Sequence, residues 1–547
     1  MSLQFITGNS GNGKTKYLFN RIVKEAKANP RDNYLVIVPE QFTMQTQRQL
    51  VDLSENKAIM NIDVLSFKRL AYRVFDELGI TNLTVLEETG KNLVLRKLAA
   101  QEADKLGVIG RNLNRIGYIS EVKSLLSELV QYNISPEELG RYIASGRLSD
   151  TLSDKLKDVL VLYEAFEKFM QDKYITAEEI LNVLSNVAEE SAILRNSVIA
   201  FDEFTGFTPI QNQLIKKLFV ISKKIYVTLT IDCREDIFKS RGMQELFDMP
   251  KRTVKSLTEM AAFYGIEVEE PIILDKNYRL AENEELSFME QQLFRKRRCS
   301  FEKAPKHIHI DCLRDPKQEL TKIARRINEL VRNENLRYRD IAIVTGDVNI
   351  YAGYVREIFD KYNIPYFIDA TQEILFHPFI EFIRSIPDIA TQNFSADAVF
   401  RFLRCGFSEL LDSEIDVLEN YVLACGVRGK SAWDKKWVRL PKHKAGYDIE
   451  LLNQSREYIM ELLKPVYQVF SDKKSTVKDY VLAIYKLIVL LDIPDKLAKK
   501  EQALLDAGDQ TASKEYGQIY KIVMQLFEKY VAVLGDECMD AEEFTQI

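Results

Sequence analysis

Residues 8–15 have the residue types and the spacing needed to bind a phosphate group, and we call them the phosphate loop. They read G-N-S-G-N-G-K-T and match G-x-x-x-x-G-K-[ST] at every fixed position. Glycines let such a loop curl, so that several backbone N–H groups point at one phosphate. The predicted nucleotide-binding residues are therefore Gly8, Asn9, Ser10, Gly11, Asn12, Gly13, Lys14 and Thr15.

The last two residues of the loop supply its polar chemistry. Lys14 would place a cation beside the β- and γ-phosphates of ATP, and Thr15 would offer its hydroxyl to Mg²⁺. The flanking sequence fits this prediction, because residues 3–7 read as a short buried strand and apolar residues recur at helical spacing after the loop. A chance glycine turn is the less favoured alternative.

A second candidate for chemistry is the acidic pair Asp202 and Glu203. It follows the four-residue apolar run 198–201, which is the pattern of a central parallel strand. An aspartate at such a strand end can hold the Mg²⁺ shell, and a glutamate can orient or deprotonate the attacking water. We therefore predict Asp202 as a metal residue and Glu203 as a catalytic one.

The elements that would position these residues predict an α/β protein with large helical insertions. Strands are predicted within residues 34–41 and 225–232, and residues 87–190 are helical in pattern. A second α/β unit follows, with strands predicted at 307–312, 340–346 and 364–369 and helices at 319–331 and 354–363. From about residue 378 the pattern is helical again.

Composition sets the broad class of the protein. The chain has 547 residues, of which 46% are hydrophobic and 29% charged, and a net charge of −6, as in ordinary globular proteins. It shows no apolar run long enough for a bilayer and no signal peptide, so we expect a cytoplasmic protein without membrane contact. The six cysteines are scattered, and no cluster of them could hold iron and sulfur.

Several of these stretches, in this order, resemble superfamily 1A helicases of the UvrD/Rep type. They are the phosphate loop, VPEQ at 38–41, the acidic pair with Gln211 beyond it, and NYR at 277–279. More closely, GNSGNGKT, VIVPEQFTMQTQ, VLSFKRLAYRVF and FDEFTGFTPIQ resemble the AddB (RexB) family. Members of that family are B subunits of ATP-dependent helicase/nucleases that process double-strand DNA ends for homologous recombination.

The resemblance implies P-loop (RecA-like) parallel-sheet domains of superfamily 1A type. A first RecA-like domain would span 1–290 with a helical 1B-like insertion at about 87–190. The first part of a second RecA-like domain would span 291–385, and a truncated helical 2B-like domain 386–547. It also implies that Arg279 reaches the γ-phosphate from an interdomain cleft; a surface arginine paired with a nearby acid is the alternative.

The family further implies a heterodimer with an AddA-type helicase/nuclease subunit, which is the motor, and a role in holding DNA and recognising the Chi sequence. A helix is predicted to open at Asp540, and the sequence stops within about two turns of that point, so we expect an N-terminal fragment. The nuclease domain, with its iron–sulfur cluster, would then lie beyond residue 547. ATP and Mg²⁺ are the ligands expected within these residues.

This sequence departs from the pattern of an active helicase in three places, one of which is that it stops before the later motifs that complete the second motor domain. Only seven residues precede Gly8, which leaves no room for the upstream glutamine that reads adenine in UvrD-type enzymes. The segment 233–238, CREDIF, lacks the Gly-Asp…Gln pattern that couples the phosphate site to DNA. A stand-alone UvrD-like helicase and a structural subunit that binds ATP without hydrolysing it remain the alternatives, and a small-molecule P-loop kinase is a distant one.

Overall fold

The computed structural model describes residues 1–80, 85–107, 116–146, 148–170, 174–295, 299–369, 374–440 and 447–546. The chain divides into two compact units. Unit 1 comprises Met1–Glu282 together with Phe382–Ile547, and unit 2 comprises Asn283–Glu381. None of the described helices is both long enough and apolar enough to cross a membrane.

Unit 1 contains a seven-stranded sheet within the described part of the chain, and every strand pair in it is parallel. The order is β3-β2-β6-β7-β1-β8, with β9 also paired to β1. The strands are β1 (Ser2–Gly8), β2 (Tyr34–Ile37), β3 (Ile62–Leu65), β6 (Val198–Phe201), β7 (Lys224–Thr230), β8 (Glu267–Val268) and β9 (Ile272–Leu274). The strands predicted at 3–7, in 34–41, at 198–201 and in 225–232 are therefore confirmed.

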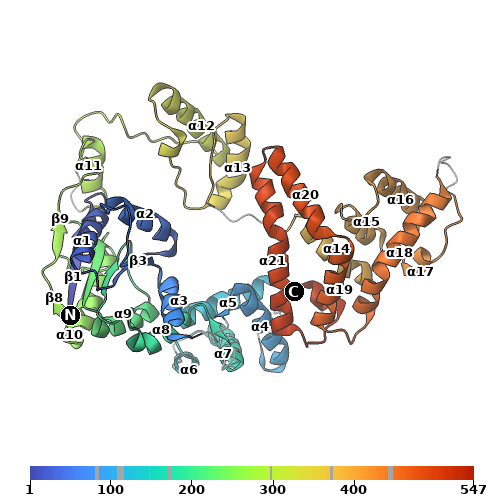
Figure 1. The fold of residues 1–547 in the computed structure, drawn as a ribbon, viewed down its shortest axis with the longest axis horizontal. Coiled ribbons are helices and arrows are strands. Elements are labelled where there is room, and N and C mark those ends of the chain that lie inside the picture. The colour runs from blue at the N-terminus through green and yellow to red at the C-terminus, as the bar shows by residue number, and fades with distance from the viewer. Residues whose placement is uncertain are drawn as a thin grey trace. The chain divides into compact units, whose positions relative to one another are not determined.

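Helices cover both faces of this sheet, because side chains alternate between the faces along each strand. In β6, for example, Ile199 and Phe201 join one apolar cluster while Val198 and Ala200 join the other. The first cluster includes residues of α3 (Phe67–Leu78), α8 (Ile180–Val187), α9 (Pro209–Ile221) and α10 (Asp248–Phe263), and the second includes residues of α1 (Lys14–Ala28) and α2 (Thr43–Leu53). Figure 1 shows these helices around the strands.

The region from residue 87 to residue 190 is mostly helical and has an apolar core of its own. Its main helices are α4 (Glu88–Gln101), α5 (Ile116–Gln131), α6 (Pro136–Ala144) and α7 (Asp150–Met170), followed by α8. Ser135 caps α6, since its hydroxyl accepts from the Glu138 N–H. The pattern missed one detail, a two-stranded parallel sheet of β4 (Val85–Leu86) and β5 (Ile175–Thr176).

The C-terminal part of the described chain is helical, as its pattern predicts. It contains α14 (Pro378–Thr391), α15 (Ala396–Leu403), α16 (Asp412–Cys425), α17 (Lys430–Asp434), α18 (Ile449–Ser471), α19 (Val477–Leu490), α20 (Ile493–Asp506), α21 (Gln510–Leu534) and α22 (Ala541–Gln546). Asp540 caps α22, since its carboxylate accepts from the Glu543 N–H at 2.8 Å.

In unit 2 the predicted helices form but the predicted strands do not. The two predicted helices correspond to α12 (Pro316–Asn333) and α13 (Val348–Lys361), which pack on each other around a small apolar cluster, and α11 (Glu284–Gln292) precedes them. Segments 307–312, 340–346 and 364–369 contain no strand. A strand needs a hydrogen-bonded neighbour, and apolar residues that suggested burial are exposed instead: Ile310 by 94%, Val344 by 92% and Phe367 by 88%. The strand prediction is wrong for these segments.

Candidate functional site

The phosphate loop connects the end of β1 to the start of α1, so it lies at the carboxyl edge of the sheet. Gly13 caps α1 with a φ of 80° and Gly11 has a φ of 90°, both in the left-handed region that favours glycine. A Cβ at Gly11 would also lie 2.9 Å from the Arg279 Cβ, closer than real Cβ atoms approach. The loop therefore leads into a helix whose free N–H groups and positive end favour an anion.

The acidic pair lies beside this loop, as the sequence predicts. Thr15 Oγ1 lies 3.3 Å from Asp202 Oδ1 and 3.3 Å from Glu203 Oε1. Thr228, on the neighbouring strand β7, also donates to Asp202 Oδ1. Thr15 and Thr228 thus both lie within hydrogen-bonding reach of Asp202, although they are 187 and 26 residues away from it in the sequence.

Burial disfavours the charged forms of both Asp202 and Lys14. Burial raises the pKa of Asp202, even though the hydroxyls of Thr228 and Thr15 act against that shift. Burial likewise lowers the pKa of Lys14, against the attraction of Glu203 and Asp202. Lys14 Nζ donates to the Asn9 carbonyl at 3.0 Å. A bound anion beside Lys14 and a cation beside Asp202 would each stabilise the charged form of its neighbour.

The oxygen atoms here suit a magnesium ion that arrives with a nucleotide. Asp202 Oδ2 is buried and has no hydrogen-bond partner among the described residues, so one hard oxygen is left for a ligand. No group of three or more His, Cys, Asp or Glu side chains is placed for a metal in the part of the chain that the structure describes. Mg²⁺ is commonly held by one or two protein oxygens plus substrate phosphates, and Thr15 with Asp202 meets that need.

Glu203 adopts a strained backbone conformation at this position. Its φ is 65°, in the left-handed region that non-glycine residues rarely occupy and that costs about 1–3 kcal/mol. Such strain concentrates at functional sites, where it directs a side chain that regular geometry would turn away. Here it accompanies a Glu203 carboxylate that faces Thr15.

Segment 274–279, which contains the NYR residues, packs directly on the phosphate loop. Asn12 Nδ2 donates to the Leu274 carbonyl at 2.6 Å, and the Tyr278 N–H donates to the Gly11 carbonyl at 3.0 Å. Asn277 Nδ2 donates to the Ser10 carbonyl at 3.0 Å. The Tyr278 N–H and the Asn277 amide thus hold two loop carbonyls, and segment 274–279 restrains the conformation of the phosphate loop.

Arg279 lies within unit 1, next to the loop rather than across an interdomain cleft. Its Nη1 is 3.4 Å from Ser10 Oγ. Asn277 Oδ1 accepts from the backbone N–H groups of Arg279 and Leu280, at 3.1 and 3.0 Å, and so fixes this turn. The guanidinium therefore approaches the site from the same unit as Lys14.

These residues surround one cavity of about 750 Å³, a volume typical of small-molecule sites. Tyr278 stands at its rim with 65% of its surface exposed and could stack on a base. The NYR motif pointed only to a role for its arginine, so the contributions of Asn277 and Tyr278 were not predicted. The cavity is lined by Ser10, Gly11, Gly13, Lys14, Thr15, Lys16, Phe19, Gln49, Asp52, Leu53, Asp202, Glu203, Phe204, Thr205, Thr228, Thr230, Tyr278 and Arg279.

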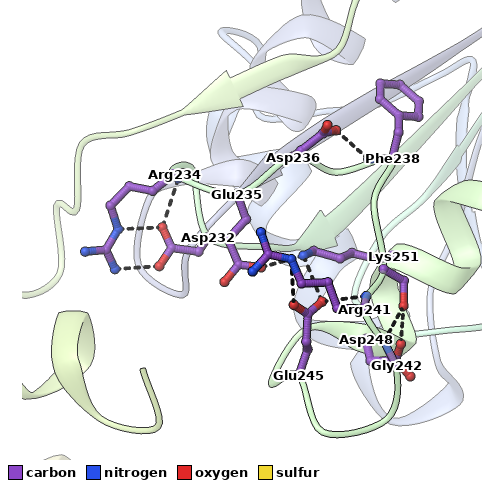
Figure 2. A network of polar contacts seen from close by, with 11 residues as sticks. Asp232, Arg234, Glu235, Asp236, Phe238, Arg241, Gly242, Glu245, Asp248 and Lys251 are labelled. Carbon is purple, nitrogen blue, oxygen red and sulfur yellow. Dashed lines mark hydrogen bonds and ion pairs between the residues drawn. The ribbon is translucent and has the colours of Figure 1, made fainter. Parts of the chain in front are cut away.

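The segment CREDIF belongs to a network of ion pairs just after β7 (Figure 2). Asp232 is buried, and its carboxylate accepts from Arg234 Nε and Nη2 at 2.9 and 2.6 Å. Lys251, on α10, is also buried and contacts Glu235 at 2.6 Å and Glu245 at 3.3 Å. The network holds the chain that follows Thr230, a residue of the cavity wall.

The FTGFTP phrase after the acidic pair has a structural role. Thr208 and Gln211 form a reciprocal cap at the start of α9, with Pro209 in its first turn. Phe204 and Phe207 pack against Phe67 and Phe201 in an aromatic cluster, with neighbouring ring centroids 5.3–6.3 Å apart. The cap and the cluster fix the chain directly beyond Glu203.

Comparison with known proteins gives the family. Residues 5–290 match the family model described as "ADDB, N-terminal". The chain belongs to the AddB family. Over its full length this AddB-family chain is 38% identical to the B subunit of the ATP-dependent helicase/deoxyribonuclease of Lachnoclostridium phytofermentans. It is 31% identical to the proteins of the same name from Clostridium acetobutylicum and Clostridioides difficile.

The match covers only part of those proteins. The aligned region includes 100% of this AddB-family chain but 48% of each of the three relatives. The chain therefore spans about half the length of the curated relatives it matches.

Proposed function

We propose that this chain is the N-terminal, helicase-like part of the B subunit of a heterodimeric ATP-dependent helicase/exonuclease. That enzyme would process double-strand DNA breaks for homologous recombination in the cytoplasm. The chain would bind ATP at the phosphate loop and contribute to DNA and Chi-sequence binding, while an AddA-type subunit supplies the motor. The names of its bacterial relatives, which describe one subunit of a helicase/deoxyribonuclease, support this proposal.

One observation carries the ATP-binding part of the proposal. Lys14, Thr15, Asp202, Glu203 and Arg279 line the same cavity, although the sequence scatters them over more than 260 residues. This is the set of groups that phosphoryl chemistry uses: a cradle of N–H groups, cations for the phosphates, oxygens for Mg²⁺ and a carboxylate for water. It favours a P-loop domain of the RecA-like, superfamily 1A kind.

The roles of the residues follow from their positions. Lys14 and the loop N–H groups would hold the β- and γ-phosphates, and Arg279 would approach them from the side of Ser10. Thr15 and Asp202 would hold Mg²⁺, which screens the phosphate charge when it is bound. Glu203 would orient or deprotonate the attacking water.

The nuclease named in the relatives belongs, in this proposal, to the part of those proteins that this chain does not match, together with any iron–sulfur cluster. Two alternatives concern the ATP site itself. The close approach of Glu203 to Thr15 favours ATP hydrolysis at this site. Such hydrolysis would occur either within the heterodimer or in a stand-alone UvrD-like helicase. In a structural subunit that does not hydrolyse ATP, the same loop would bind the nucleotide and Glu203 would have no catalytic role.

ATP turnover decides between these possibilities. The full-length protein is assayed with and without linear duplex DNA, and with and without its partner subunit. The proposal expects ATP binding by the chain itself and DNA-stimulated turnover that requires the partner. DNA-stimulated turnover and strand separation by the chain alone would establish a stand-alone helicase, and failure to bind ATP would refute the proposal.

A further inference from the structure

Residues 427–440, which we call the basic loop, concentrate positive charge in a chain whose net charge is negative. They contain five Lys and Arg residues against one Asp, while the whole chain has a net charge of −6. Lys430 pairs with that Asp434 at 2.9 Å. The other four basic side chains are exposed and have no ion pair among the described residues: Arg428, Lys435, Lys436 and Arg439.

The basic loop contains both tryptophans of the chain, and their buried side chains anchor it to the rest of the unit. Trp433 is fully buried and Trp437 is only 7% exposed. Their rings meet edge to face with centroids 5.3 Å apart, and Trp437 Nε1 donates to the Ala432 carbonyl at 3.0 Å. Buried aromatic side chains of this size stabilise a structure strongly, so this exposed segment has an anchor of the kind usually found in a core.

Buried polar side chains of α18 fix the backbone around the two tryptophans. The Asn453 amide binds both the N–H and the carbonyl of Trp437, each at 2.9 Å. Arg456, itself 5% exposed, donates from Nη1 to the Trp433 carbonyl at 2.8 Å. Since burying an amide and a guanidinium is unfavourable unless each is hydrogen-bonded, these contacts define one conformation of the loop.

The far end of the loop is fixed as well. The Tyr421 hydroxyl of α16 donates to the Arg439 carbonyl at 2.7 Å. The free basic side chains are thus carried on a backbone held at Trp433, Trp437 and Arg439. A surface that is already ordered loses little conformational freedom when a ligand binds, and this favours affinity.

We propose that the basic loop is a contact surface for the phosphate backbone of DNA. Uncompensated cations at fixed positions complement a regular polyanion, and neutralising phosphates releases counterions. The inference rests on the proposed function, since the names of the relatives supply DNA as the substrate. The indole rings are buried, so they cannot stack on bases, and the contact is electrostatic and independent of sequence.

The test removes three of the four charges at once. The full-length protein carrying Lys435→Gln, Lys436→Gln and Arg439→Gln is compared with wild type for binding to a labelled linear duplex. Divalent cations are left out so that the DNA stays intact. The variant should bind about 10-fold or more weakly at 100 mM salt. The slope of log affinity against log salt should become shallower by about 2–3, since each lost phosphate contact accounts for about 0.9.

A matched control removes the same number of charges elsewhere in the same unit. Lys486→Gln, Lys500→Gln and Lys521→Gln change exposed lysines that have no ion pair among the described residues. This control should keep wild-type affinity and salt slope, and both triple variants should keep wild-type ATP affinity and thermal stability. Equal weakening in the two triple variants would mean a general charge effect and would overturn the assignment.

One other result would also overturn it, namely unchanged DNA binding in the basic-loop variant. If that variant also associated more weakly with the partner subunit, the surface would be assigned to a protein instead. The failure of the proposed function is distinguishable, because in that case the wild-type protein would bind neither ATP nor DNA.

Discussion

The phosphate loop lies in a cavity assembled from distant parts of the chain, whereas the basic loop carries its cations on one continuous segment. At the phosphate loop, Lys14 is partly buried and its charge is disfavoured until an anion arrives. At the basic loop, Lys435 and Lys436 are exposed, whereas the two tryptophans of the same segment are buried. The first arrangement suits a small anion that can be enclosed, and the second suits a polyanion that cannot.

This difference has an experimental consequence. The two regions share no residue, and no hydrogen bond or ion pair joins them among the described residues, so changes in one should not affect the ligand of the other. Substitutions at the cavity should alter ATP binding or turnover and leave salt-dependent DNA binding intact. A cavity substitution that weakened both ligands equally would remove the distinction between the two regions.

The largest effect is expected from Glu203→Gln. The substitution keeps the shape of the side chain but removes the base, so ATP hydrolysis at this site should fall about 100- to 10,000-fold. ATP affinity and duplex affinity should stay at wild-type values. Single-turnover kinetics with a partner subunit whose own ATP site has been inactivated by mutation would measure the effect. Unchanged turnover in that complex would show that Glu203 is not the base.

A smaller effect is expected from Asn277→Ala. The substitution removes the donor to the Ser10 carbonyl and the acceptor for Arg279 and Leu280. ATP and ADP should bind about 10-fold more weakly, as expected if roughly 1–1.5 kcal/mol of hydrogen bonding is lost. Calorimetric titration gives the affinity, and hydrogen exchange at Gly11 and Gly13 should become faster because the loop is less restrained.

Asn20→Ala provides the control for that variant, because Asn20 is an exposed residue of α1 close to the same loop. It should match wild type in both measurements. If Asn277→Ala left loop exchange and ATP affinity unchanged, segment 274–279 would have no positioning role.

The smallest effect concerns stability at Asp202. Burial raises the pKa of this carboxyl in the folded state, so its charged form is disfavoured there. Its contribution to stability is therefore most favourable below the unfolded pKa and declines as the pH rises through the higher folded pKa. Asp202→Asn should raise the melting temperature of the nucleotide-free protein at pH 8 by about 2 °C.

The gain should shrink as the pH is lowered through the raised pKa, and calorimetric melts at several pH values would show this. The same variant should lose Mg²⁺-dependent ATP binding. If Asp202→Asn melted at a lower temperature than wild type at pH 8, the buried Asp202 carboxylate would not be destabilising.

The sequence predicted the parts of the site that are local in the chain. The phosphate loop is one continuous segment, and the strand before Asp202 has an unbroken apolar run, so periodicity and spacing were sufficient. The position of Arg279 was not predictable in the same way. It depends on β9 pairing with β1, which brings residues more than 260 positions apart into register.

Two other features were not predictable from the sequence for physical reasons. In unit 2, the apolar runs at 307–312, 340–346 and 364–369 look like buried strands, but their side chains are largely exposed and no ladder forms. In the basic loop, the sequence alone shows two tryptophans and several basic residues within a region of helical pattern. Only the hydrogen bonds that Asn453 and Arg456 make with the tryptophan backbone show that they form one anchored segment.

The central claim is that the phosphate loop binds ATP through Lys14, and one measurement tests it most directly. ATP affinity is determined by calorimetry for wild type and for Lys14→Ala, with Mg²⁺ and without DNA. Since the substitution removes the cation aimed at the β- and γ-phosphates, affinity should fall by about 100-fold or more while duplex binding and thermal stability are kept. Equal ATP affinity in the two proteins would contradict the account.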